Sequence, residues 1–257
     1  MTKKLTKKLL LVLIIVLIIW SFVTIEYIDL SYFTASYIRP IVQGLLNPDW
    51  SYVYSGTSED LVHLILDTVA IAFYGTVLGT LLSLFFVLLS SYSLWGRWTF
   101  VPRFGRGVLN ILRSIPTLIY AILFVRIVGP GEFAGGLAIG TQLVGMLGKL
   151  ISEAMDNIDD TPVESMTSVG ASSVQTFHYA RLPQVMPIAI SHVLNHFEIS
   201  VRSATILGLV GGGGIGAPVI FALQARNWSR VSIILLSIIV VVLVIDNIST
   251  MIRRRLV

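Results

Sequence analysis

The stretch ISEAMDNIDDTPVESMTSVGASSVQTFHYARLP, residues 151–183, is the longest polar interruption in an otherwise apolar chain. Acidic residues crowd its first half. A helix-like piece follows, then Gly170, then a second piece that ends at Leu182 and Pro183. Glycine permits a tight turn with positive φ, and proline fits the first turn of a following helix. The pattern predicts a folded helix–turn–helix rather than an irregular connection.

The composition predicts a membrane protein. Of 257 residues, 55% are hydrophobic and only 12% are charged, whereas about a quarter of a typical soluble domain is charged. The chain has no cysteine, which excludes disulfides, thiolate metal sites and cysteine nucleophiles. The net charge of +4 is small and unevenly placed. It therefore indicates membrane topology and not nucleic-acid binding.

Apolar runs long enough to cross a bilayer, about 17–25 residues each, predict about six transmembrane helices. They are residues 9–25, 61–90, 108–128, 133–151, 184–207 and 231–251. The first run follows four lysines, as in a signal peptide, but no small-x-small cleavage site comes after it. We therefore expect an uncleaved first span. Glycines in the fourth run predict close helix packing, and Pro116 should kink the third or open its first turn.

The distribution of Lys and Arg predicts the orientation. The N-terminal lysines, a basic aromatic loop at residues 95–106 and the C-terminal arginines fall on one side of a six-span chain. That loop contains Arg97, Arg103 and Arg106. This side should be the cytoplasm, so both termini and the polar stretch at 152–183 lie inside. The acidic segment 26–60 then lies outside. We expect two parts: residues 1–60, a helix with an external segment, and residues 61–257, the main transmembrane domain.

The polar stretch resembles the cytoplasmic coupling motif of importer-type ABC permeases, which reads EAA, three residues, Gly, nine residues, I-x-L-P. The match lies in Glu164, Gly170 six residues later, and Leu182-Pro183. The chain departs from the motif at Ser165, Met166 and Ala180. The resemblance implies that a separate ATPase contacts Glu164, Gly170, Ala171, Leu182 and Pro183. No G-x-x-x-x-G-K-[ST] motif occurs in the chain. ATP and Mg²⁺ should therefore bind in the partner, and this chain should have no cofactor and no catalytic residue.

Four further blocks resemble the phosphonate-uptake branch of these permeases. They are RSIP at 113–116, FAGGLA at 133–138, GMLGKL at 145–150 and TILGLVGGGGIG at 205–216. The resemblance covers about residues 61–251. It implies a methionine-permease-like fold, a homodimer in a bacterial inner membrane, two cytoplasmic ATPase copies and an external binding protein. The expected function is import of phosphonate, phosphite or a phosphate ester by alternating access.

The fifth run has a polar line on one helical face. Its members, Ser191, Asn195, Glu198, Arg202 and Thr205, are spaced by 4, 3, 4 and 3 residues. Polar groups inside a membrane face a pathway, a partner or one another. Glu198 and Arg202 are also placed to form a structural i,i+4 ion pair, so both interpretations stay open. His192 and His196 have zinc-like spacing, but no third ligand accompanies them, and we expect no metal site.

Two more segments are candidates for the pathway. Gly211 and Gly212 begin a G-x-G-x-x-G run, but no acid lies between Glu198 and Asp246, which argues against a dinucleotide site. The run predicts either a tight turn beside a pathway or a flexible outer loop. Arg113 and Ser114 open the third run, where Arg113 either contacts the substrate or extends to the interface.

The sequence is also compatible with two other functions. A channel or secondary transporter would need buried titratable relays, and the spans offer few, chiefly Asp67, Glu198 and Asp246. A permease for an amino acid such as methionine would be favoured by the opposite charges of Glu198 and Arg202.

Overall fold

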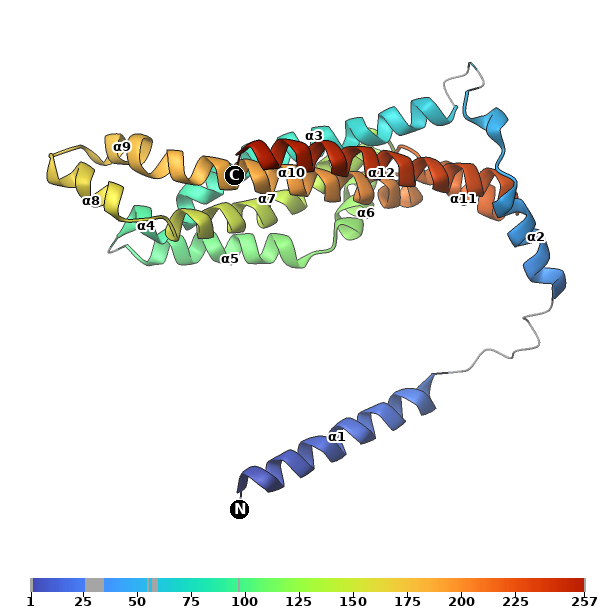
Figure 1. Cartoon of the computed structure of the whole chain (residues 1–257), viewed down its shortest axis with the longest axis horizontal. Helices are drawn as coiled ribbons and strands as arrows, with labels where there is room; N and C mark the ends of the chain where they lie inside the picture. The colour runs from blue at the N-terminus through green and yellow to red at the C-terminus, as the bar shows by residue number, and fades with distance from the viewer. Residues whose placement is uncertain (1, 26–34, 55, 57–59, 97, 257) are drawn as a thin grey trace. The chain divides into compact units, whose positions relative to one another are not determined.

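Helices form the described part of the chain (Figure 1). The computed structural model describes residues 2–25, 35–54, 56, 60–96 and 98–256, and no strand occurs among them. The predicted all-α class is confirmed. The chain divides into two compact units, Met1–Gln43 and Gly44–Val257, and helix α2 (Ala35–Leu46) crosses the division. The boundary near residue 60 stays a prediction. Residues 26–34, 55 and 57–59 of the predicted external segment lie outside the described residues. So does Arg97 of the predicted basic loop.

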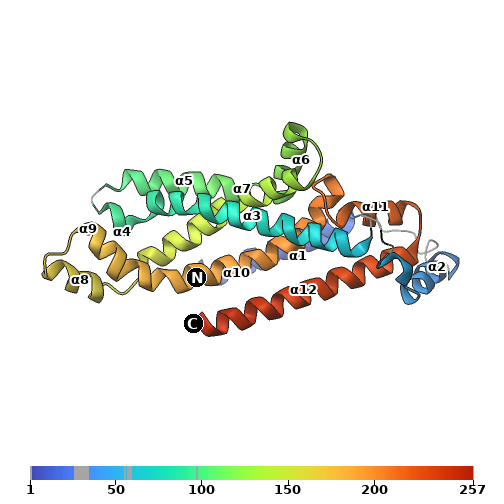
Figure 2. The same cartoon turned by 90° about the horizontal axis from the view of Figure 1, so that it is seen from above.

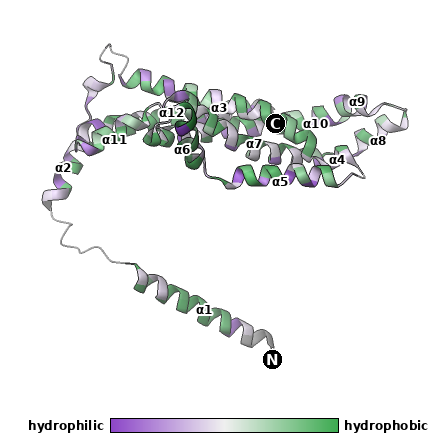
Figure 3. Ribbon diagram, turned by 180° about the vertical axis from the view of Figure 1, so that it is seen from behind, coloured by the Kyte–Doolittle hydropathy of each residue, from purple (hydrophilic) through white to green (hydrophobic). Residues whose placement is uncertain are grey.

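The first unit contains α1 (Thr2–Thr24). Residues Thr6–Thr24 are long and apolar enough to cross a membrane, and Figure 3 shows hydrophobic residues over most of the helix. A helix that is apolar on all faces belongs in a membrane or a large core. This helix corresponds to the predicted first span.

The second unit contains the remaining helices. They are η2 (Trp50–Tyr52), α3 (Leu61–Ser90), α4 (Tyr92–Trp95), α5 (Phe100–Ser114), α6 (Thr117–Val128), α7 (Glu132–Asp156), α8 (Thr161–Ser168), α9 (Ser173–Thr176), the π-helical turn Phe177–Arg181, α10 (Leu182–Leu207), η4 (Gly208–Val210), α11 (Gly216–Gln224) and α12 (Trp228–Leu256). By length and composition, α1, α3, α7 and α12 can each cross a membrane. The bent pair α5–α6 adds a fifth span if it counts as one. Helix α10 has 26 residues but carries the polar line, so the total of six stays a prediction.

The predicted third span is broken at Pro116. Helices α5 and α6 meet there at 85°, and α6 lies across the direction of α5 in Figure 2. Proline disfavours the helical conformation of the residue before it, and Ile115 is extended with ψ 123°. The predicted kink is thus a complete break.

The predicted basic loop at 95–106 is wrong for Arg103 and Arg106. Both lie on α5, which begins at Phe100. The charges suggested a loop, but α5 is an amphipathic helix with one side buried at Pro102, Gly105 and Leu109. Arg103 lies on its exposed side, whereas Arg106 is partly buried and bonds to Ser90 O and Asp156. Figure 3 shows green and purple alternating along α5.

Small residues bring α3 and α7 together along their length. A Cβ added at Gly75 would lie 2.7 Å from Ile139 Cβ, and one at Gly79 would lie 2.6 Å from Leu143 Cβ. Gly136 and Gly140 of α7 face α3 with equally little space. Close backbone approach through glycine is typical of membrane helix pairs. The packing predicted for the fourth span is therefore present in α7, with a matching pair of glycines on α3.

The second unit has two distinct ends. Helices α8 and α9 project at one end, whereas α11 and the first turn of α12 lie at the other (Figures 1 and 2). Long helices between them carry mostly hydrophobic residues, whereas α8 and α9 are paler and more polar (Figure 3). The polar stretch therefore stands clear of the apolar body.

Candidate functional site

The turn between α8 and α9 is a complete Schellman motif centred on Gly170. The N–H of Gly170 donates to Thr167 O at 3.0 Å, and the N–H of Ala171 donates to Met166 O at 3.0 Å. These two bonds are the pair that defines this helix ending. Gly170 has φ +80°, and nothing lies within 4 Å of a Cβ built on it. Its backbone conformation, and not lack of space, therefore requires glycine.

The second helical piece is capped and continuous with α10. Ser172 and Gln175 form a capping box, in which Ser172 N donates to Gln175 Oε1 at 2.8 Å. Helix α9 continues through the π-helical turn into α10, with Pro183 in the first turn of α10. Because Pro183 lacks an N–H, it cannot continue the α-helical bonding of this turn. Leu182 begins α10, so the last two residues of the coupling motif, Leu182 and Pro183, are the first two residues of this helix.

A glutamine clamp fastens this hairpin to α10. The N–H of Asp159 donates to Gln184 Oε1 at 3.0 Å, and Gln184 Nε2 donates back to Asp159 O at 3.2 Å. Asp159 also accepts from the N–H and hydroxyl of Thr161, which lowers the pKa of its carboxyl. Gln184 was not a sequence candidate, since its partner is 25 positions away. The two bonds therefore tie the segment before α8 to the first turn of α10.

The hairpin exposes large side chains to solvent. Val169 is 80% exposed, Val174 77% and Tyr179 68%, and Glu164 is exposed beside them. Val169 and Tyr179 border a shallow hollow of about 380 Å³ that Gly170 and Ala171 also line. Soluble surfaces seldom leave such apolar groups together without a binding role. This surface suits contact with a separate protein.

A second polar node lies where α7 ends. Asp156 accepts from Ser91 Oγ at 2.6 Å, from Ser93 N at 2.9 Å and from Tyr92 N at 3.2 Å. Arg106 Nη2 pairs with the same carboxylate at 2.5 Å, and its guanidinium lies 4.4 Å from the Tyr92 ring centroid. Asp156 thus joins the ends of α3 and α7 to α4 and α5. Sequence reasoning saw Asp156 only as one acid of the polar stretch.

The polar face of α10 contains an ion pair. Arg202 donates to Glu198 Oε1, and Arg253 of α12 lies 4.0 Å from Glu198 Oε2. The Glu198 side chain is only 12% exposed, whereas that of Arg202 is 53% exposed. The structural pair foreseen as an alternative is therefore present, but it leaves about half of the Arg202 side chain exposed. Asn195 lies half-buried one turn away.

The glycine segment is packed tightly against its neighbours. The N–H of Gly211 donates to Gly208 O and that of Gly212 to Leu207 O, so both amides are used within the turn. Gly211 O accepts from Gly131 N at 2.8 Å. A Cβ on Gly135 would lie 2.3 Å from Gly212 O. The segment is a tight interruption between α10 and α11, which replaces the interpretation as a flexible loop.

Arg113 and Ser114 end α5, just before the break at Pro116. Both are exposed, and Ser114 Oγ donates to Ile111 O at 2.8 Å. Within the described residues, no ion pair or hydrogen bond joins them to the polar face of α10. His196, one of the two histidines with zinc-like spacing, is buried with Nδ1 2.9 Å from His192 O. One nitrogen of that ring is thus engaged with the backbone.

Residues 94–257 match the model of the family described as "Binding-protein-dependent transport system inner membrane component". The chain belongs to this family. The matched range includes the helical hairpin, α10 and the glycine segment. The resemblance to importer-type ABC permeases is therefore confirmed.

Relatives and solved structures agree with this membership. This inner membrane component is 34% identical over 211 residues to the putative phosphite transport system permease protein HtxC of Stutzerimonas stutzeri, covering 79% of this chain and 74% of that protein. It is 32% identical over 241 residues to the phosphate-import permease protein PhnE of Mycolicibacterium smegmatis, covering 92% and 44%. The methionine import permease MetP of Bacillus subtilis is 28% identical over 157 residues, covering 58% and 70%.

An inward-facing structure of the MetNI methionine ABC transporter superimposes with a TM-score of 0.67 at 21% identity, covering 77% of this chain and 96% of that one. At this identity the likeness shows the fold alone. The predicted methionine-permease-like fold is confirmed.

Proposed function

We propose that this chain is the permease subunit of an ATP-driven importer for a phosphorus oxyanion: phosphonate, phosphite or a phosphate ester. The capped hairpin around Gly170 carries the proposal, because it is an exposed docking element joined to α10 through Gln184. The similarity to phosphite and phosphate permeases supports the substrate class. Arg202 supplies an accessible positive charge on the polar face. The chain is not itself an enzyme.

The proposed assembly contains two copies of this chain, two cytoplasmic ATPases and an external binding protein. Glu164, Gly170, Ala171, Leu182 and Pro183 would form the coupling contacts. ATP and Mg²⁺ would bind to the ATPases, and closure of the ATPase pair would move the hairpins and reorient α10. The chain would lie among the lipids of a bacterial inner membrane, with both termini in the cytoplasm and no nucleic acid bound.

Uptake measurements test the substrate class. The transporter is expressed with its co-encoded ATPase and binding protein, and import of radiolabelled phosphite, methylphosphonate and methionine is followed in separate assays. Unlabelled methionine is added as a competitor in the two anion assays. We expect import of a phosphorus anion that methionine does not reduce. Import of methionine alone would favour the amino-acid alternative, which the ion pair Glu198–Arg202 would suit.

Arg202→Gln should reduce anion uptake more than tenfold while the subunits still assemble. A tenfold loss corresponds to about 1.4 kcal/mol, which one charge-assisted hydrogen bond can supply. Uptake and co-purification of the ATPase are measured together. The double variant Glu198→Gln/Arg202→Gln is the control. If Arg202→Gln fails to assemble and the double variant recovers, the pair is structural and the pathway assignment is wrong.

A further inference from the structure

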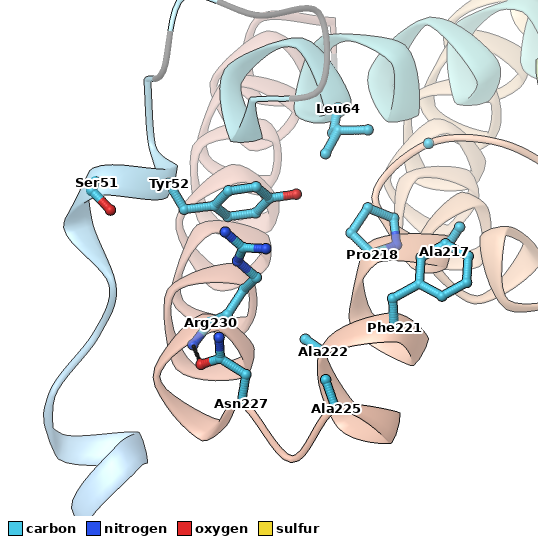
Figure 4. Close-up of a pocket in the computed structure, with 11 residues that line it drawn as sticks. Ser51, Tyr52, Leu64, Ala217, Pro218, Phe221, Ala222, Ala225, Asn227 and Arg230 are labelled. Atoms are coloured by element: carbon cyan, nitrogen blue, oxygen red, sulfur yellow. Dashed lines mark hydrogen bonds between the residues drawn. The ribbon is translucent and has the colours of Figure 1, made fainter.

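A pocket of about 890 Å³ opens at the end of the second unit opposite α8 and α9 (Figure 4). Elements η2, α3, α11 and α12 form it. Its lining comprises Ser51, Tyr52, Leu64, Gly214, Ala217, Pro218, Phe221, Ala222, Ala225, Asn227 and Arg230. Of the segments predicted to border the pathway, the glycine run contributes Gly214 to this lining. A volume of this size is ample for a small organic anion.

One wall of the pocket is fixed by contacts between segment 44–53 and the start of α12. A Cβ on Gly44 would lie 2.3 Å from Trp228 Cβ, so the two backbones touch. Asp49 N donates to Ser229 O at 3.1 Å, and Ser232 Oγ donates to Leu45 O at 2.7 Å. Beneath them, Leu61, Ile215, Val231 and neighbours form a buried apolar cluster. The pocket is therefore preformed.

The two walls of the pocket differ in chemistry. In Figure 4, Ser51, Tyr52, Asn227 and Arg230 lie on one side, whereas Ala217, Pro218, Phe221, Ala222 and Ala225 lie on the other. Leu64 closes the space from α3. A ligand that fits both walls has a polar head and a small apolar substituent.

Arg230 provides a positive charge on the polar wall. Its guanidinium lies 4.3 Å from the Tyr52 ring centroid, which holds it by a cation–π contact. Asp49 Oδ2 is 3.9 Å from Nε, beyond hydrogen-bond reach, so it compensates the charge only in part. Arg230 also stands in the first turn of α12, where the helix dipole is positive. An anionic head is therefore favoured here.

We propose that this pocket receives an organic phosphonate before transport, with its phosphono group at Arg230 and its carbon substituent against Pro218 and Phe221. The inference rests on the proposed function and narrows it. An anion without carbon, such as phosphite, would use only the polar wall. Each CH₂ buried against the apolar wall is expected to tighten binding about fourfold. The pocket would therefore prefer ethylphosphonate to phosphite.

Protection of an introduced cysteine tests the pocket directly. The native chain has no cysteine, so modification of this chain in Ala225→Cys, within the full transporter in phosphatidylcholine nanodiscs, reports on the pocket. We expect ethylphosphonate to slow its modification by a thiol reagent at lower concentration than phosphite does. Gln224→Cys, exposed but outside the lining, is the matched control and should be unaffected.

Two variants in the Ala225→Cys background separate the walls. Arg230→Gln should weaken protection by both anions about tenfold, as expected for a lost charge-assisted hydrogen bond. Phe221→Ser should remove the preference for ethylphosphonate and leave protection by phosphite. Arg226→Gln, which changes an exposed arginine outside the lining, should leave protection as it was.

Two results would overturn the inference. One is modification that ethylphosphonate does not slow in any of these proteins. The other is protection that appears with phosphatidylglycerol nanodiscs and no phosphonate, which would make a lipid headgroup the occupant. Uptake is scored separately. If a phosphorus anion is imported normally but gives no protection, the proposed binding site is refuted and the proposed function stands. If no such anion is imported, the proposed function is refuted.

Discussion

Replacing Asp156 by alanine should destabilise the purified permease by about 3 kcal/mol, because it leaves Arg106 without its partner inside the protein. The same carboxylate accepts from Ser91 Oγ and from the N–H groups of Tyr92 and Ser93. Its side chain is 16% exposed and that of Arg106 is 29% exposed. We expect a lower midpoint of thermal unfolding and lower yield in the membrane, both measured by fluorescence-detected gel filtration.

The control is an ion pair on the same helix. Lys149 and Glu153 approach to 3.6 Å, but the Glu153 side chain is 42% exposed. Glu153→Gln should therefore cost less than about 1 kcal/mol. Equal midpoints for Asp156→Ala and Glu153→Gln would show that the node at Asp156 contributes little to stability.

Local sequence signals predicted the parts of the fold that neighbouring residues determine. Proline disfavours a helical conformation in the residue before it, and glycine permits positive φ, so the break at Pro116 and the turn at Gly170 could be predicted locally. The 4, 3, 4, 3 spacing on α10 placed Glu198 beside Arg202 because helical geometry alone brings them together. The family motif then located the hairpin.

Contacts between distant segments could not be predicted in this way. Asp156 meets Arg106 across 50 positions, and Gln184 meets Asp159 across 25. Neither pair has a local spacing rule. The sequence does not show that Tyr52 and Asp49 lie against Arg230, so it does not predict the pocket that these residues border. Arg103 and Arg106 suggested a loop because their charge outweighed the helical pattern of α5.

Gly170→Val should abolish coupled uptake while the permease still inserts and folds. The position has φ +80°, and a β-branched residue there is strained by about 1–3 kcal/mol. The turn would relieve this strain by reopening, which breaks the bonds from Gly170 N and Ala171 N to α8. Val169 and Tyr179 would then lose their fixed spacing on the exposed surface. Co-purification of the ATPase and substrate-stimulated ATP hydrolysis measure the loss.

Gly170→Asn is the matched variant that separates backbone strain from side-chain size. Nothing lies within 4 Å of a Cβ at this position, so both substitutions have room. Asparagine tolerates the left-handed conformation far better than valine does. We therefore expect Gly170→Asn to retain most uptake and Gly170→Val to lose it, with equal amounts of both proteins in the membrane. Normal uptake and hydrolysis in Gly170→Val would refute the coupling role, whereas equal loss in both variants would mean that the partner tolerates no side chain at this turn.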